Sequence, residues 1–146
     1  MKPRVLFLCS GNSARSQMAE ALLRSITHGG IDTFSAGTEP RPLHPLAVKA
    51  MAEVGIDISG NRSKNLDEYL SQDFDFVISV CARSAQQCPK WPHSREQIRW
   101  SLDDPSEATG TEGQSLAVFR RIRVELRHRL ALFVLANKLA PEARLT

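Results

Sequence analysis

Cys9 is followed, after five residues, by Arg15 and Ser16. The five residues between them are small or favour turns: Ser10, Gly11, Asn12, Ser13 and Ala14. A loop of this kind can curl so that its backbone N–H groups point inward, and such a concave row of donors holds an anion. The spacing therefore predicts an oxyanion-binding loop that contains a cysteine.

A helical pattern begins at this loop, and it explains why a thiol stands there. The positive end of the helix dipole and the planar guanidinium of Arg15 both suit a tetrahedral oxyanion. The same field favours the thiolate of Cys9, which is the nucleophilic form, and the Ser16 hydroxyl can donate a further hydrogen bond. The alternative is a buried cysteine that closes a core strand, but the C-x5-R-S spacing favours a nucleophile.

Two more cysteines, Cys81 and Cys88, follow the apolar run FDFVISV at residues 74–80. Three cysteines do not suit a disulfide-stapled scaffold, so they indicate either reactive thiols in a reducing compartment or small buried residues. Cys81, Cys88 and His93 as zinc ligands are the less favoured alternative, because their spacing matches no common zinc pattern. We expect no metal site.

Short apolar runs alternate with helical patterns along the chain. Strands are expected at residues 4–8, 33–36, 74–80 and 97–102, and helices after Arg15, from Pro45, around 66–70 and after a capping box of Thr111 and Gln114. This alternation predicts a parallel sheet covered by helices, within a single domain spanning residues 1–146. Such sheets bind ligands at the carboxyl ends of their strands, where Cys9, Cys81 and the DDP segment fall.

Several segments in order carry a resemblance to a known family: CSGNSARSQMAEALLR, SAGTEP, HPLAVKAMAEVGIDIS, the Cys81 to Cys88 segment and DDP. Over about residues 4 to 135 the chain resembles the arsenate reductases built on the low-molecular-weight tyrosine phosphatase fold. The resemblance implies an α/β three-layer sandwich with a four-stranded parallel sheet flanked by helices. It also implies an enzyme that reduces arsenate to arsenite.

The resemblance to the thioredoxin-coupled reductases implies a role for each cysteine. Cys9 attacks arsenate, Cys81 then attacks Cys9 and releases arsenite, and Cys88 attacks Cys81 to leave a disulfide that thioredoxin reduces. Glutaredoxin is the alternative reductant. The resemblance also makes Asp104 the acid that protonates a departing oxygen, with Asp103 less favoured; an ordinary Asp-Pro turn is the alternative.

Some positions depart from the related families. Phosphatases with this loop typically carry a second cysteine, a proline and an aromatic residue where this chain has Ala14, Gln17 and Ser106. In the reductases that match best, an Asn, a Glu, a Ser and an Asp together support a potassium ion. In this chain Lys64 stands at the position of that Asp. A lysine ammonium can take the place of the cation beside Glu20, so we expect no potassium dependence and no tightly bound cofactor.

Two other functions remain open, namely a phosphatase that uses Cys9, Arg15 and Asp104, and a redox sensor without turnover. The net charge of +3 is modest, so no nucleic-acid partner is expected. No apolar run is long enough for a membrane helix or suits a signal peptide, so the expected location is the cytoplasm. A monomer is the expected state.

Overall fold

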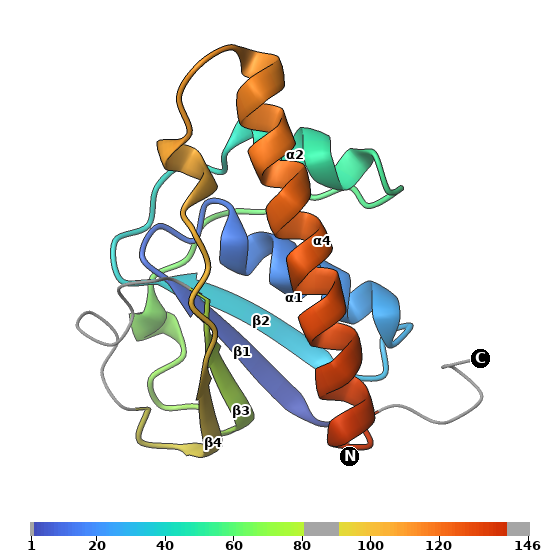
Figure 1. Cartoon of the computed structure of the whole chain (residues 1–146). Helices are drawn as coiled ribbons and strands as arrows, with labels where there is room; N and C mark the ends of the chain where they lie inside the picture. The colour runs from blue at the N-terminus through green and yellow to red at the C-terminus, as the bar shows by residue number, and fades with distance from the viewer. Residues whose placement is uncertain (1, 81–90, 140–146) are drawn as a thin grey trace.

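The computed structural model describes residues 2–80 and 91–139. Its centre is a four-stranded sheet with the order β2-β1-β3-β4 (Figure 1). The strands are β1 (Arg4–Cys9), β2 (Asp32–Gly37), β3 (Phe74–Ser79) and β4 (Ser94–Arg99). Each neighbouring pair is parallel, which confirms the predicted sheet.

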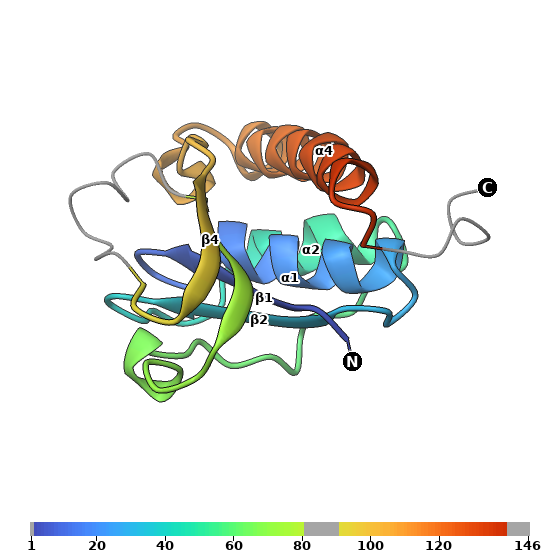
Figure 2. The same cartoon turned by 90° about the horizontal axis from the view of Figure 1, so that it is seen from below.

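In the described part of the chain, three helices cover one face of the sheet, and one short 3₁₀ helix covers part of the other. The helices are α1 (Arg15–Ile26), α2 (Pro45–Ala52) and α4 (Glu112–Ala136), with the 3₁₀ helices η1 (Leu66–Glu68) and η2 (Pro105–Glu107). Figure 2 shows α1, α2 and α4 on the same side of the sheet and η1 on the opposite side. On that opposite side Leu66 and Trp91 pack against Leu6 and Leu8 of β1. The layered α/β fold is as predicted.

Side chains alternate between the two faces along β1, so the Cys9 side chain points toward α1. Val5, Phe7 and Cys9 belong to the core between the sheet and the helices, whereas Leu6 and Leu8 belong to the core on the other face. Because both faces are covered, the whole run is apolar and buried. The cysteine thus ends a rigid central strand on the side where α1 begins.

The fourth strand was predicted in the wrong place. It covers Ser94–Arg99 rather than residues 97–102. β4 is an edge strand, and its first residues are polar. A prediction based on apolar runs therefore does not detect where the strand begins. After the strand, Trp100 donates its N–H to the Ser79 carbonyl, and the chain then leaves the sheet toward the β1–α1 loop.

The long final helix forms as the sequence predicts. Thr111 Oγ1 accepts from the Gln114 N–H at 3.1 Å, and Gln114 Oε1 accepts from the Thr111 N–H at 2.8 Å. The predicted apolar stripe is buried: Leu116, Phe119, Ile122, Leu126, Leu130 and Phe133. Within residues 2–80 and 91–139, no helix combines the length and the apolar character that crossing a membrane requires.

Candidate active site

The site lies at the carboxyl edge of the sheet, where the loop of residues 10–14 joins β1 to α1. α1 begins at Arg15, and the residue before it, Ala14, has no side-chain acceptor to cap the helix. The first turn of α1 therefore keeps N–H groups available for an anion, which is what an oxyanion site at a helix N-terminus requires.

The sulfur of Cys9 accepts two hydrogen bonds at the base of this loop. Its Sγ lies 2.8 Å from Ser16 Oγ and 3.2 Å from the Asn12 backbone nitrogen. The Asn12 amide Nδ2 donates to Ser16 Oγ at 2.8 Å, which leaves the Ser16 hydroxyl proton to point at the sulfur. Both contacts hold the Cys9 sulfur in one position at the base of the loop.

Asn12 is fixed from behind the loop by the side chains of Gln17 and Ser63 and by the Lys64 backbone, and the sequence did not predict these contacts. Its backbone has a φ of 48°, in the left-handed region that asparagine tolerates better than most residues. Gln17 Nε2 lies 3.2 Å from the Asn12 carbonyl and 3.1 Å from its Oδ1, while Ser63 Oγ lies 2.9 Å from the same carbonyl and shares its proton between this carbonyl and that of Arg41. The Lys64 N–H donates to Asn12 Oδ1 at 2.8 Å. These contacts aim the Asn12 N–H at the sulfur.

Arg15 is held by the segment that follows β4. Its guanidinium donates to the Leu102 carbonyl at 3.1 Å and lies 3.3 Å from Asp104 Oδ2. Arg15 is only 5% exposed, so the planar fork keeps one orientation at the pocket. A preset guanidinium of this kind binds two oxygens of a tetrahedral anion without a large ordering cost.

Asp104 has the extended backbone that the following proline imposes, with φ −83° and ψ 107°. Its Oδ1 accepts from the Ser106 N–H at 3.0 Å and from the Ser106 hydroxyl at 2.7 Å. Burial raises the pKa of Asp104, but Ser106 and the nearby guanidinium groups of Arg15 and Arg41 outweigh burial and hold the pKa below its ordinary value. Asp103, in contrast, is exposed and pairs with Arg121.

The pKa of Asp104 depends on the charge that the pocket binds. A bound oxyanion adds negative charge beside the carboxylate and shares Arg15 with it, and both effects raise the affinity of Asp104 for a proton. The geometry therefore suits a proton donor that takes up its proton when the substrate binds. Its role as the acid stays a prediction.

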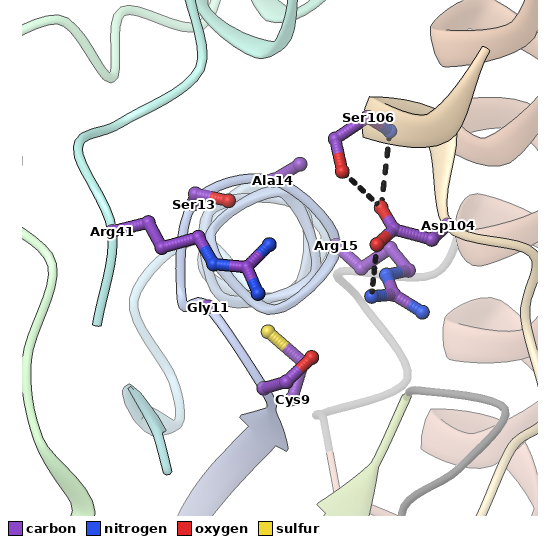
Figure 3. A pocket seen from close by; sticks show the side chains of 9 residues that line it. Cys9, Gly11, Ser13, Ala14, Arg15, Arg41, Asp104 and Ser106 are labelled. Atoms are coloured by element: carbon purple, nitrogen blue, oxygen red, sulfur yellow. Dashed lines mark hydrogen bonds and ion pairs between the residues drawn. The ribbon is translucent and has the colours of Figure 1, made fainter. Parts of the chain in front are cut away.

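Nine described residues line the pocket: Cys9, Ser10, Gly11, Ser13, Ala14, Arg15, Arg41, Asp104 and Ser106 (Figure 3). Asn12 and Ser16, also predicted for the site, are fully buried behind the pocket wall and act on Cys9. Arg41 was not predicted, because a single arginine in a proline-rich loop gives no sequence signal. Cys81 and Cys88 lie outside the described residues.

A half-buried cation, the ammonium of Lys64, lies behind the loop. Lys64 Nζ is 3.8 Å from Glu20 Oε1, and the Ser35 hydroxyl donates to the same Glu20 oxygen at 2.5 Å. Burial lowers the pKa of Lys64 although Glu20 acts against that shift. The Lys64 ammonium thus lies beside Glu20, as the sequence predicts. Within the described ranges no three His, Cys, Asp or Glu side chains form a group that could hold a metal ion.

In this parallel α/β fold, a buried cysteine lies inside an anion-binding loop at a helix N-terminus. This arrangement is typical of proteins that act on tetrahedral oxyanions through a thiolate. The chain belongs to the low molecular weight phosphotyrosine protein phosphatase family, whose model matches residues 4–144. It is 43% identical over 137 residues to an arsenate reductase of Halalkalibacterium halodurans, covering 94% of this chain and 99% of that relative.

A solved structure of an arsenate reductase in the phosphate binding state is similar, with a TM-score of 0.79 and 38% identity. The match covers 93% of this chain and 98% of that one. A thioredoxin-dependent arsenate reductase of Corynebacterium glutamicum has a TM-score of 0.69 and 28% identity, over 92% of this chain and 63% of that chain. A glutaredoxin arsenate reductase of Synechocystis is 39% identical over 127 residues, covering 87% of this chain and 92% of that relative.

Proposed function

We propose that this chain reduces arsenate to arsenite, with Cys9 as the nucleophile. The observation that carries the proposal is the Cys9 sulfur, which accepts hydrogen bonds from Ser16 and Asn12 at the base of a pocket that also holds Arg15. The relatives described as arsenate reductases, and the similar structure in a phosphate binding state, support arsenate as the anion.

In the first step the Cys9 thiolate attacks arsenic, forming an S–As bond. One oxygen leaves as water after it takes a proton, and Asp104 is the donor that the pocket offers. Arg15 and the N–H groups of the loop hold the remaining oxygens and stabilise the negative charge. Arsenic remains in the pentavalent state at this stage, so the step moves no electrons to it.

Reduction requires a second thiol. The Cys81 thiolate attacks Cys9 Sγ, an S–S bond forms, and the S–As bond breaks so that its electron pair stays on arsenic, which leaves as arsenite. The residue before Cys81 supports this step: Val80 donates its N–H to the Leu8 carbonyl at 2.8 Å, next to Cys9. Cys88 then attacks Cys81 and releases the Cys9 thiolate.

The disulfide between Cys81 and Cys88 then needs an external dithiol. We propose thioredoxin, in line with the thioredoxin-dependent relative, and keep glutaredoxin as the alternative because another relative is described with it. Exchange with either partner takes two electrons from the reductant for each arsenite formed.

A single-turnover experiment tests the chemistry without any partner. The fully reduced protein is mixed with excess arsenate, and arsenite is measured together with the disulfides, which are located by mass spectrometry of peptides. We expect about one arsenite per chain and a Cys81–Cys88 disulfide. Cys88→Ser should give the same arsenite with a Cys9–Cys81 disulfide, whereas Cys9→Ser should give none. Arsenite formed by Cys9→Ser would refute the proposed nucleophile.

A phosphatase that forms a phosphocysteine intermediate is the second candidate function, favoured by the family model and by the shared loop. Cys81→Ser separates the two functions, because hydrolysis of a phosphate monoester needs Cys9, Arg15 and Asp104 but no second thiol. If arsenate reduction is lost in Cys81→Ser while phenyl phosphate hydrolysis persists, reduction depends on the relay and hydrolysis is a side activity of the same loop.

Potassium gives a further prediction for this site. The Lys64 ammonium lies 3.8 Å from Glu20 Oε1 and carries a positive charge there. We expect steady-state arsenate reduction to be unchanged when potassium chloride replaces sodium chloride at equal ionic strength. In Lys64→Asp the cation is missing, so potassium should raise the low rate of that variant. A potassium response of the unmodified protein would contradict the assignment of Lys64.

A further inference from the structure

We propose that Arg41 determines specificity by binding the oxygen of a free tetrahedral anion that points to the mouth of the pocket. Arg41 would thereby favour inorganic oxyanions over phosphate monoesters. This inference rests on the proposed function in taking arsenate as the substrate, and it adds the reason why this site would discriminate against an ester.

The backbone of Arg41 is tied to the oxyanion loop. Its N–H donates to the Gly11 carbonyl at 2.9 Å, and its carbonyl accepts a hydrogen bond from the Ser63 hydroxyl. The side-chain stem lies over Gly11, since a Cβ built there would be 3.5 Å from Arg41 Cδ. The loop after β2 therefore carries Arg41 to a fixed point beside the pocket.

The guanidinium of Arg41 is directed into the pocket. Figure 3 shows Arg41 and Asp104 reaching in from opposite sides, with the sulfur of Cys9 pointing toward the space between them. Its charge also reaches Asp104, because it helps to hold the pKa of that carboxyl below its ordinary value. Arg15 and Arg41 thus bring two guanidinium groups to one pocket from two different elements.

The geometry of the displacement determines which oxygen of the substrate Arg41 contacts. In an in-line attack by sulfur, the leaving oxygen lies opposite the sulfur and therefore faces the pocket mouth. In free arsenate or phosphate this oxygen is a hydroxyl or an oxyanion, which accepts a strong hydrogen bond from a guanidinium. In a monoester the same oxygen bears an organic group and is a poor acceptor.

The lining of the pocket favours the smaller anion as well. None of the nine described residues that line it is aromatic, and Ser13, Arg41, Asp104 and Ser106 give it a polar and charged character. A phenyl group at the mouth would have to displace the Arg41 guanidinium and would gain no apolar contact from these residues. Arg41 therefore stabilises the free anion and opposes the aryl ester.

Binding is measured without turnover, by the protection of Cys9 from iodoacetamide. The two probes are inorganic phosphate and phenyl phosphate, each titrated against the wild type, Arg41→Ala and Arg41→Lys. We expect Arg41→Ala to weaken phosphate binding about tenfold or more, as the loss of a charge-assisted hydrogen bond does. Phenyl phosphate binding should change by less than about threefold, and Arg41→Lys should be intermediate for phosphate.

Arg127→Ala is the matched control, because Arg127 is exposed on α4 and its loss lowers the net charge equally. An equal weakening of both probes in Arg41→Ala, or an effect of the same size in Arg127→Ala, would show that charge alone acts and would overturn the inference. The ratio of the two affinities does not depend on arsenate turnover. A wild type that fails to reduce arsenate would refute the proposed function, while the shifted ratio would still support Arg41.

Discussion

Gln17 shows how much the reactive sulfur depends on a residue that never touches it. The Gln17 side chain is fully buried and its amide donates toward Asn12 and toward the Arg62 carbonyl at 2.9 Å. Asn12 in turn places one N–H on Cys9 and directs the Ser16 hydroxyl to it. Gln17 is thus a positioning residue for the thiolate.

Replacing Gln17 by Met keeps the volume and removes every hydrogen bond of the amide. We expect the free energy of unfolding to fall by about 1–3 kcal/mol, because buried carbonyls lose donors. We also expect Cys9 to react more slowly with iodoacetamide near neutral pH, because Asn12 no longer holds its N–H on the sulfur.

Gln17→Glu is the matched variant, because it keeps the length and one acceptor but loses the amide donor. It should show the same slower reaction of Cys9 with iodoacetamide. An unchanged alkylation rate in both variants, with only the stability lowered, would mean that Gln17 is a core residue with no effect on the Cys9 sulfur.

The sequence predicted the residues of this site that carry a recognisable motif or resemblance and missed those that support the loop from behind or from other segments. Cys9, Arg15 and Ser16 are recognisable because one loop carries them at a fixed spacing. Ser63 and Arg41 act through contacts between residues 22 to 51 positions apart. Gln17 lies only five residues from Asn12, but its contact with Asn12 depends on how the loop folds. A single sequence gives no signal for such contacts, since each residue is also an ordinary surface or core residue by type.

At the scale of elements, the end of β2 fixes the shape of the oxyanion loop. A Cβ built on Gly37 would lie 2.6 Å from the Ser10 carbonyl oxygen and 2.9 Å from the Asn12 nitrogen. The next residues continue along the loop, where Thr38 and Glu39 donate their N–H groups to Cys9 and Ser10. Only glycine allows β2 to approach the loop this closely.

Gly37→Ala therefore should force the loop away from β2. We expect a loss of about 1–3 kcal/mol in the free energy of unfolding, as overpacking typically costs. We also expect phosphate to protect Cys9 much less well, because the N–H groups of the loop shift. Thermal unfolding and the iodoacetamide assay measure the two effects.

Gly60→Ala is the control, since nothing lies within 4 Å of a Cβ at that position. It should leave phosphate binding unchanged. If Gly37→Ala bound phosphate as well as the wild type, the close approach of β2 would have no part in shaping the site.

The elements themselves were largely predictable, with one instructive error. Buried strands such as β1 and β3 are continuous apolar runs, and α4 carries both a capping box and a stripe, so their patterns are unambiguous. β4 is a polar edge strand whose place depends on pairing with β3, and no local pattern shows that pairing. The error matters, because the segment after β4 carries Asp104 to Arg15.

At the scale of the whole molecule, Glu53 links α2 to α4. It follows the last residue of α2 and accepts hydrogen bonds from Arg120 at 2.5 Å and from Arg123 at 2.9 Å. These bonds lower the pKa of Glu53 from 4.5 to about 2. The two helices that cover the same face of the sheet are therefore joined by a contact that depends on pH.

The sign of this dependence follows from the lowered pKa. As pH falls, the unfolded chain takes up a proton on Glu53 near its ordinary pKa of 4.5, while the folded protein resists until about 2. The contribution of Glu53 is complete above that ordinary value and is lost as pH falls toward about 2. Glu53→Gln should thus be destabilised relative to wild type at neutral pH, and the difference should shrink in acid.

Urea unfolding midpoints of the two proteins near neutral pH and in acid check this prediction. Glu125→Gln is the control, since Glu125 pairs with Arg129 within a single helix at 3.2 Å and joins no two elements. Its midpoint should stay close to that of wild type. A difference between wild type and Glu53→Gln that remained constant with pH would contradict the role assigned to the carboxylate.

We propose that three thiols act in sequence on arsenate, and steady-state NADPH oxidation is the measurement that tests this. The assay contains arsenate, thioredoxin and thioredoxin reductase, and compares the wild type with Cys9→Ser, Cys81→Ser and Cys88→Ser. We expect arsenate-dependent turnover in the wild type and its loss in all three variants. A wild type that is silent with thioredoxin and also with glutaredoxin, yet cleaves phenyl phosphate through Cys9, would contradict it.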